Sequence, residues 1–233
     1  MTQPMRLTAD HVRLVHRDIP DPGPDPRFKH FSDADYTNHL SDFLKQRPAG
    51  PAAVFCYGSL IWKPAFKAVT VARAKALDWR RSFCLHMERW RGSAEQPGLM
   101  MQIDRGGQCE GVIQEIAAAG EAQTLLDLWQ REMTIKPPGN NPRWIEVESE
   151  GGRRRVIAFT ANPQSPNYAG ALPADTVAHR LSVACGHLGS NAEYLLQTVT
   201  ALESEGIHDP HLWDLQERVA LLIEQRFPDA YLA

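Results

Sequence analysis

The sequence predicts an α+β fold in which a small mixed, barrel-like β-sheet is flanked by helices. Three observations lead to this prediction. Apolar strands and glycine-bearing hairpins fill most of residues 52–161, a single helix interrupts them, and helices dominate the rest of the chain. Strands and helices do not alternate regularly, and no G-x-G-x-x-G follows a strand. The pattern therefore disfavours a doubly wound, dinucleotide-binding sheet.

Composition narrows the class of protein. The 233 residues fit one large domain, and 43% hydrophobic residues allow a sizeable core. The formal charge of -3 is weak and mixed, which argues against a nucleic-acid binder. No apolar run is long enough to cross a membrane, and no leader pattern opens the chain, so we expect a cytoplasmic protein. Free thiols are expected at the four cysteines because none forms a CxxC pair: Cys56, Cys84, Cys109 and Cys185.

Residues 1–50 are predicted to be an N-terminal extension with a proline-rich segment and one helix, and residues 51–233 a globular domain. The stretch "DIPDPGPDPRF" is too rich in proline and glycine for a helix or a central strand. The following stretch, "SDADYTNHLSDFLKQRP", predicts a helix. Ser32 is its expected N-cap, Asp35 its acidic N3 residue, and Pro48 ends it.

Strands open the globular part. A short buried strand is predicted over residues 53–57, and extended segments over residues 69–87. The stretch "GLMMQIDRGGQCEGVIQEI" predicts a hairpin that turns at Gly106-Gly107, and "RWIEVESEGGRRRVIAFTA" predicts another that turns at Gly151-Gly152. The run Arg153–Arg155 is interpreted as a solvated edge that faces Glu146, Glu148 and Glu150 rather than as a phosphate site.

Helices are predicted over residues 118–133, 173–187, 190–206 and from 210 onward. Ser190 and Glu193 form the pattern of a capping box, and Gly206 ends that helix. The last helix has Asp209 as its expected cap and Pro210 at its first position.

One carboxylate breaks the amphipathic pattern of the helix predicted over residues 118–133. With 100° per residue, Glu132 falls between Leu125 and Leu128 on the apolar arc. A buried carboxylate needs a partner or acquires a raised pKa, and the negative end of the helix dipole also raises the pKa. Two interpretations stay open here: Glu132 is a general base or acid, or it is a structural partner of a nearby arginine.

Other chemistries have weaker support. His208 and His211 lie across a helix start without HExxH or cysteine companions, so no metal site is expected. Ser59 lacks the G-x-S-x-G pattern of a serine nucleophile. Cys56 precedes a turn, but its apolar neighbours favour an inert buried thiol over a nucleophile.

That turn, Tyr57-Gly58-Ser59, lies between two apolar segments in "AAVFCYGSLIW". Gly58 lets a ligand approach the backbone closely, and the N–H groups of such a turn favour a carboxylate or an oxyanion. An ordinary tight turn would explain the same three residues.

Six stretches together resemble the ChaC-type γ-glutamylcyclotransferases. They occur in the order of that family and cover about residues 52–222: "VFCYGSLIWKPAF", "WRRSFCLHMERWRGSAEQPGL", "GGQCEGVIQEI", "LLDLWQREM", "NYAGALP" and "GSNAEYLLQTV". The resemblance implies a small mixed barrel with flanking helices, so that residues 51–233 would be the catalytic domain. The N-terminal extension lies outside the resemblance.

The resemblance also implies site residues. The substrate loop of the family falls on residues 56–61, namely Cys56, Tyr57, Gly58, Ser59, Leu60 and Ile61. The catalytic carboxylate falls on Glu132, and a C-terminal tyrosine motif falls on Asn191 and Tyr194, whose hydroxyl is a candidate substrate contact. The chain departs from the family pattern in two places. Cys56 stands where glycine or alanine is usual, and "REMTIKPPGN" lacks a common aromatic residue, which leaves substrate breadth open.

The implied activity is intramolecular cyclisation of the γ-glutamyl group of glutathione to 5-oxoproline with release of Cys-Gly. The class would be a carbon–nitrogen lyase that requires no cofactor and no metal. The expected partner is a small-molecule substrate, glutathione or another γ-glutamyl compound, and neither nucleic acid nor membrane; the protein can be monomeric. Three alternatives stay open: a cyclotransferase for other γ-glutamyl amino acids or γ-glutamylamines, a non-catalytic regulator that binds a carboxylate, and an amidase that uses Cys56.

Overall fold

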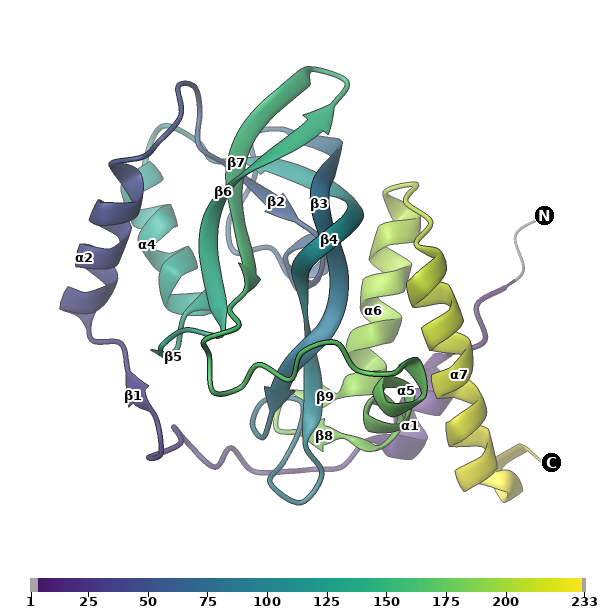
Figure 1. The fold of residues 1–233 in the computed structure, drawn as a ribbon. Coiled ribbons are helices and arrows are strands. Elements are labelled where there is room, and N and C mark those ends of the chain that lie inside the picture. The colour runs from purple at the N-terminus through teal and green to yellow at the C-terminus, as the bar shows by residue number, and fades with distance from the viewer. Residues whose placement is uncertain (1–3, 232–233) are drawn as a thin grey trace. The chain divides into compact units, whose positions relative to one another are not determined.

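The structure is a computed structural model that describes residues 4–231, and Figure 1 shows its helices and strands. Their bounds, in chain order, are α1 (Ala9–Val15), β1 (Lys29–His30), α2 (Asp33–Leu44), β2 (Ala53–Cys56), α3 (Ser59–Trp62), β3 (Val71–Met87), β4 (Gly98–Glu115), α4 (Glu121–Glu132), β5 (Ile135–Lys136), β6 (Asn140–Ser149), β7 (Gly152–Ala161), α5 (Ala174–Val183), β8 (Cys185–Gly186), β9 (Gly189–Ser190), α6 (Asn191–Ser204), α7 (Pro210–Arg226) and the 3₁₀ helix η1 (Pro228–Tyr231).

Five strands form a closed barrel in the order β2–β4–β3–β6–β7, and β4 also pairs with β7. The sheet is mixed, because β2 pairs antiparallel with β4 but parallel with β7. Two small sheets, β1–β5 and β8–β9, account for the remaining strands of the described residues. The predicted α+β class with a barrel-like mixed sheet is confirmed.

The chain divides into two compact units, each described here by itself. Residues 25–82 and 102–168 form the first, which we call the barrel unit. The second, which we call the helical unit, contains residues 4–24, 83–101 and 169–231 of the described chain. Residues 4–50 thus contribute to both units, with a break after residue 24.

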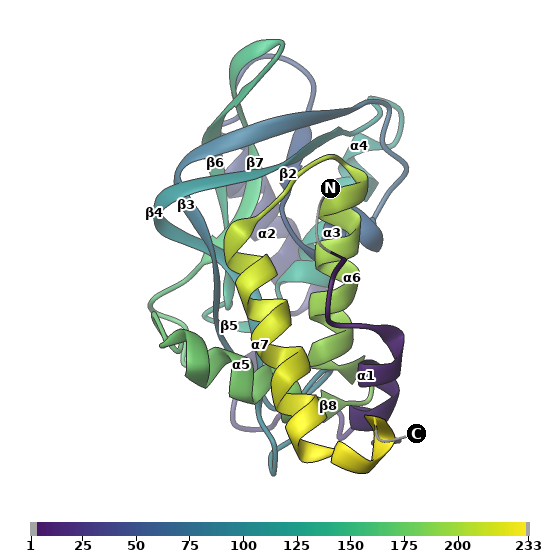
Figure 2. The ribbon, with the colours of Figure 1, turned by 90° about the vertical axis from the view of Figure 1, so that its right-hand side faces the viewer.

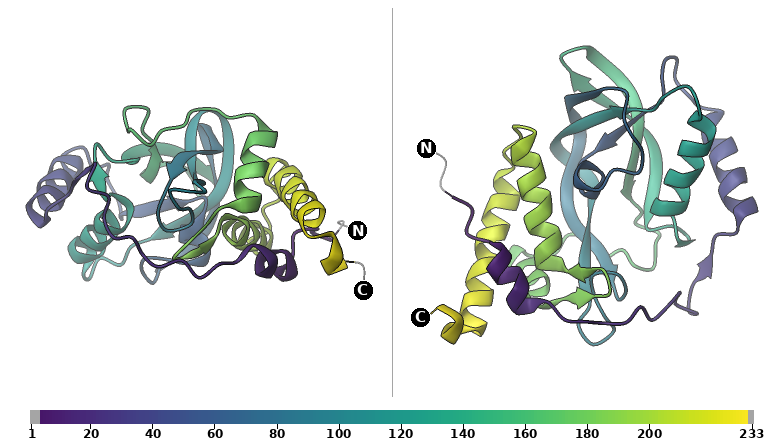
Figure 3. Two further views of the ribbon diagram at one scale, coloured as in Figure 1. Left: turned by 90° about the horizontal axis from the view of Figure 1, so that it is seen from below. Right: turned by 180° about the vertical axis from the view of Figure 1, so that it is seen from behind.

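In the barrel unit, helix α2 lies alongside α4 (Figures 1 and 3). Ser32 caps α2 with Asp35 at N3, which confirms the predicted helix start, and the two residues form a capping box. The hydroxyl of Tyr36 donates to the backbone oxygen of Met133 at 2.7 Å. The indole Nε1 of Trp129 donates to Nδ1 of His39 at 3.0 Å. Helix α2 therefore fixes the position of the last turn of α4 through these two hydrogen bonds.

Aromatic packing extends this contact into the core of the barrel unit. The ring of Phe43 meets the edge of Trp129 at 5.1 Å and stacks on Trp144 at 5.0 Å. Trp129 is fully buried and contacts the ring of Phe159 on β7 at 5.4 Å. Burying such rings stabilises the fold by roughly 1.5–3 kcal/mol for each large side chain.

The helical unit is built from α1, α5, α6 and α7, and Figure 2 shows α6 and α7 side by side. Asp209 caps α7 by accepting from the Leu212 amide at 3.1 Å, with proline at the first turn as predicted. Ser190 caps α6 through the amide of Glu193 at 3.1 Å. The carboxylate of Glu193 is held by Arg91 at 2.7 Å, so this glutamate also ties α6 to the segment between β3 and β4.

The predicted hairpin at Gly106-Gly107 is wrong. Strand β4 runs through both glycines without reversing, and β3 stays hydrogen-bonded beside it. Both glycines have positive φ, 90° and 83°. A Cβ on Gly106 would lie 2.9 Å from Nη1 of Arg80, and one on Gly107 would lie 3.3 Å from the Arg80 Cβ. The two glycines therefore allow a close approach between neighbouring strands. A glycine pair with this role has the same residue types as a hairpin turn, which explains the wrong prediction.

The predicted hairpin near Gly151-Gly152 is confirmed, because β6 and β7 pair from Asn140↔Ala161 to Ser149↔Gly152. Arg153 lies opposite Glu148 in this register and contacts its carboxylate at 3.3 Å. Arg153 is thus solvated and charge-paired, as interpreted from the sequence, whereas Arg154 contacts Glu115 on β4 at 2.6 Å.

Candidate active site

The loop between β2 and α3 is fixed at its first residue. The backbone oxygen of Tyr57 accepts from Nε of Arg81 at 2.8 Å, and the Tyr57 hydroxyl lies 2.6 Å from the backbone oxygen of Phe159. Arg81 is 6% exposed. A buried guanidinium must be hydrogen-bonded to be tolerated, so Arg81 holds the loop firmly.

Beyond Tyr57 the loop turns at once into the short helix α3. The backbone oxygen of Gly58 accepts from the Ile61 amide at 2.9 Å, and that of Ser59 accepts from Lys63 at 2.7 Å. The first N–H groups of such a turn have no partner within it. Their use by an anionic group of a ligand stays a prediction.

Glu132 is the last residue of α4, and its side chain is 15% exposed. Its Oε1 lies 3.2 Å from Nε of Arg131, and its Oε2 accepts from Nδ2 of Asn140 at 3.0 Å. The carboxylate is therefore largely buried, as its place on the apolar arc predicted, and it has two polar neighbours.

Burial raises the pKa of Glu132 above its ordinary value, and the Arg131 charge and the Asn140 hydrogen bond oppose this rise without cancelling it. Both interpretations from the sequence thus have a basis in the geometry. Glu132 is paired with an arginine, and it also has the raised pKa that suits a proton acceptor near neutral pH.

Strand register brings further side chains to the same face of the sheet. Cys56 pairs with Val112, and Gln114 lies two residues further along β4, so Cys56 and Gln114 share a face. Val54 pairs with Ile157, which places Phe159 on that face too, and Asn140 follows because it pairs with Ala161. Helix α4 covers this face, since Trp129 contacts Phe159. Strand β2 and the Glu132 end of α4 therefore lie close together at this face.

Cys56 is fully buried within this face. Burial raises the pKa of its thiol strongly, and the Glu132 carboxylate raises it further. A thiol in this state stays protonated at neutral pH and is a poor nucleophile. The geometry favours the interpretation of Cys56 as an inert core residue.

Tyr194, the other candidate substrate contact, belongs to α6 in the helical unit and is 2% exposed. The Arg91 guanidinium lies 5.8 Å from its ring centroid, and the Phe83 ring meets it edge-on at 6.3 Å. These contacts pack the tyrosine ring within its own unit. A role of Tyr194 toward substrate stays a prediction.

Among residues 4–231, no three His, Cys, Asp or Glu side chains gather in a way that could hold a metal ion. No helix in the same stretch has the length and apolar character needed to cross a membrane.

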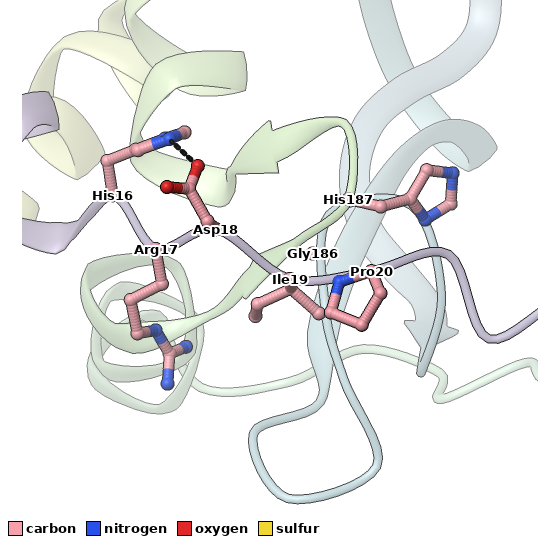
Figure 4. A pocket seen from close by; sticks show the side chains of 7 residues that line it. All are labelled: His16, Arg17, Asp18, Ile19, Pro20, Gly186 and His187. Atoms are coloured by element: carbon pink, nitrogen blue, oxygen red, sulfur yellow. Dashed lines mark ion pairs between the residues drawn. The ribbon is translucent and has the colours of Figure 1, made fainter.

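A pocket of about 340 Å³ in the helical unit is lined by His16, Arg17, Asp18, Ile19, Pro20, Gly186 and His187. Figure 4 shows His16 directed at Asp18, a contact of 3.5 Å. Arg17 donates to the Val183 backbone oxygen at 3.1 Å. The charged groups of this pocket thus have partners within the unit.

Sequence reasoning missed Arg81 and Asn140. Arg81 could have been found, because Trp79, Arg81 and Phe83 alternate on the buried side of one strand. No local pattern distinguishes Asn140 from Asn141. Only the fold shows that Asn140 begins the strand next to the end of α4 and therefore contacts Glu132.

Comparisons with known proteins show the family of the chain and agree with its fold. The model of the ChaC-like protein family matches residues 52–222. The chain is 35% identical over 195 residues to a glutathione-specific gamma-glutamylcyclotransferase of Escherichia coli (strain K12), covering 83% of this chain and 84% of that protein. It is 28% identical over 170 residues to glutathione-specific gamma-glutamylcyclotransferase 1 of Danio rerio, with 70% and 86% covered. A solved yeast gamma-glutamyl cyclotransferase specific to glutathione shares the fold, with a TM-score of 0.65 at 20% identity over 73% of this chain and 96% of that one.

Proposed function

The chain belongs to the ChaC-like protein family, and from that premise we propose that it converts glutathione to 5-oxoproline and Cys-Gly. Its similarity to glutathione-specific relatives supports this substrate. The observation that carries the proposal is the largely buried Glu132 carboxylate, whose pKa is raised, on the face that also bears the loop strand. Loop residues 56–61 are the proposed receptor for the γ-glutamyl group.

The proposed reaction occurs within one substrate molecule. Glu132 takes a proton from the α-ammonium, and the freed amine attacks the γ-carbonyl carbon. Loop N–H groups stabilise the oxyanion, and protonated Glu132 gives its proton to the leaving nitrogen. The second proton that the ring nitrogen loses ends on the amino group of Cys-Gly, which is an ammonium at neutral pH. Because the nucleophile is tethered, holding the substrate curled supplies much of the rate enhancement.

We place this reaction in the cytosol, because all four cysteines are free and buried. We also propose that the chain divides at about residue 50 into an N-terminal extension and the catalytic domain. A contact of the Tyr194 hydroxyl with substrate is a separate proposal.

Incubation of the purified protein with glutathione, and separately with γ-glutamyl-alanine, tests the function. We expect glutathione to give 5-oxoproline and Cys-Gly in equal amounts, faster than γ-glutamyl-alanine gives 5-oxoproline. In H₂¹⁸O, the 5-oxoproline should carry no ¹⁸O, since no water attacks. Release of ¹⁸O-labelled glutamate would instead show a hydrolase, and faster turnover of γ-glutamyl-alanine would favour the broader cyclotransferase.

The acid limb of the pH profile should report Glu132. The free enzyme needs the ionised carboxylate, and burial raises its pKa. Activity should therefore be lost as pH falls through a value above the ordinary glutamate pKa of about 4.3. The measurement is kcat/KM for glutathione between pH 4.5 and 9, with protein stability checked at each pH. An acid limb at or below the ordinary value would mean that another group titrates.

Cys56→Ala and treatment with a chelator should both leave turnover largely intact. The Cys56 thiol stays protonated because burial raises its pKa, and the proposed chemistry uses no metal. The variant should lose stability of about 1 kcal/mol, a typical cost for a core substitution. The measurements are kcat and the unfolding midpoint. Loss of activity on chelation that zinc restores, or an inactive but folded Cys56→Ala, would contradict the mechanism.

A further inference from the structure

Asn140, which contacts Glu132, has a side-chain oxygen that accepts no hydrogen bond from the described residues. It opens β6, and its Nδ2 donates to Oε2 of Glu132 at 3.0 Å. The unpaired oxygen, Oδ1, is buried. Nearly all buried polar atoms in proteins are hydrogen-bonded, so an unpaired amide oxygen next to a candidate base calls for an explanation.

The orientation of the Asn140 amide follows from chemistry. An ionised carboxylate can only accept hydrogen bonds, so the amide must present its NH₂ group to Glu132. The amide oxygen is then held on the other side of the group, where it can only accept. Asn140 thus places a fixed acceptor next to the proton acceptor of the site. Arg131, the other neighbour of Glu132, offers only donors.

We propose that Asn140 orients the α-amino group of the γ-glutamyl substrate: its Oδ1 accepts one N–H while Glu132 removes another proton. This inference rests on the proposed function. After the proton has moved, the new lone pair of the amine points along the former N–H bond, toward the Glu132 oxygen that took the proton. Rotation of the amino group about its C–N bond turns the lone pair toward the γ-carbonyl carbon, as attack requires, and Asn140 Oδ1 accepts one of the two remaining N–H groups in that position.

Asn140 has two groups with separable effects. Its NH₂ group bonds the Glu132 carboxylate and lowers the pKa of Glu132, so its loss should move the acid limb of kcat/KM to higher pH. Its Oδ1 is the proposed amine acceptor, so its loss should weaken only ligands that carry the α-amino group. Asn140→Ala removes both groups, whereas Asn140→Asp keeps acceptor oxygens and removes the donor.

The first experiment compares two ligands in a Glu132→Gln background, where no turnover consumes them. One is glutathione, and the other is glutaryl-Cys-Gly, the same compound without its α-amino group. Adding Asn140→Ala should weaken glutathione binding about tenfold or more, the effect of losing a hydrogen bond to a charged group. It should change glutaryl-Cys-Gly binding less than about twofold. Equal weakening of both ligands, or of neither, would overturn the proposal.

The second experiment measures kcat and the pH profile with Glu132 intact. Asn140→Ala should lower the plateau kcat by about tenfold or more and move the acid limb to higher pH. Asn140→Asp should move the acid limb further, because a second carboxylate also disfavours ionisation of Glu132. Asn141→Ala is the matched control, since this neighbour faces the other side of β6, and it should change neither quantity.

An Asn140→Ala variant with an unchanged plateau kcat and a shifted acid limb would show that Asn140 acts through its NH₂ group alone, and the proposal would fail. If the wild-type protein released no 5-oxoproline, the proposed function would fail instead. The comparison of the two ligands would still report whether Asn140 binds the amino group, so the two failures are distinguishable. Unfolding midpoints of all variants show whether the Ala variant folds, and Asn140→Leu, which keeps the side-chain volume and removes both polar groups, serves where it does not.

Discussion

Glu132→Gln is expected to fold normally and to lose turnover by at least about a thousandfold, because Glu132 is the residue proposed to serve as both base and acid. The amide keeps the shape of the side chain but cannot accept the ammonium proton, so the amine never becomes a nucleophile. Binding of glutathione should persist through the loop. The measurements are kcat for 5-oxoproline release and glutathione affinity by calorimetry.

The stability of Glu132→Gln has a definite sign. Because burial raises the folded-state pKa of Glu132, the folded protein holds this proton more tightly than the unfolded chain does. The wild type therefore loses stability as pH rises through the window between the ordinary and the raised pKa. Glutamine does not titrate, so the variant should be at least as stable as wild type at pH 7, and its advantage should shrink as pH falls through that window.

Glu121→Gln is the matched control on the same helix. Glu121 pairs with Arg47 at the opposite end of α4, with 2.5 Å between Oε1 and Nη1, and its loss should leave kcat unchanged. If Glu132→Gln stayed active but melted at a much lower temperature, Glu132 would be a structural partner of Arg131 and the base would lie elsewhere.

Gly58→Val is expected to abolish turnover, whereas Ser59→Ala should keep much of it. The loop is proposed to act through its backbone, and a β-branched side chain at Gly58 would occupy the approach of the γ-glutamyl group to the N–H groups. The Ser59 hydroxyl bonds to none of the described residues, while the Ser59 backbone oxygen holds Lys63. Ser59→Ala therefore removes only what the hydroxyl offers to a ligand.

These two variants are to be compared by kcat, glutathione affinity and unfolding midpoint, with Gly58→Ala as a milder change where Gly58→Val does not fold. An inactive Ser59→Ala that forms no complex with glutathione would show that the side chain is the recognition element. Normal turnover in a folded Gly58→Val would remove the loop backbone from the mechanism.

Local patterns predicted the elements whose stability is local. Ser32 with Asp35, and Asp209 with Pro210, identify helix starts because caps act within one turn. Glu132 stood out because a helical face depends only on spacing along the chain. The barrel-like sheet followed from strand order and composition, and the fold class was confirmed.

Long-range contacts account for what the sequence did not reveal. Gly106 and Gly107 have the residue types of a turn, but Arg80 on the adjacent strand decides that the chain continues. The position of Asn140 next to Glu132 results from the pairing of β6 with β7 and from the packing of α4 against the sheet. Neither neighbour is visible in a local window, because sheet pairing joins residues far apart in the chain.

The contacts of α2 with α4 make residues 32–44 important for the packing of α4, although the family match begins only at residue 52. A chain shortened to that residue would lose the Tyr36 hydroxyl from Met133 and the His39 acceptor from Trp129, and would bare an indole that is otherwise fully buried. Residues 52–222 grafted onto another protein would lack the same contacts of α2 with α4. The family match therefore marks the sequence that relatives share. A truncated chain that keeps the packing of the Glu132 helix would have to begin before α2.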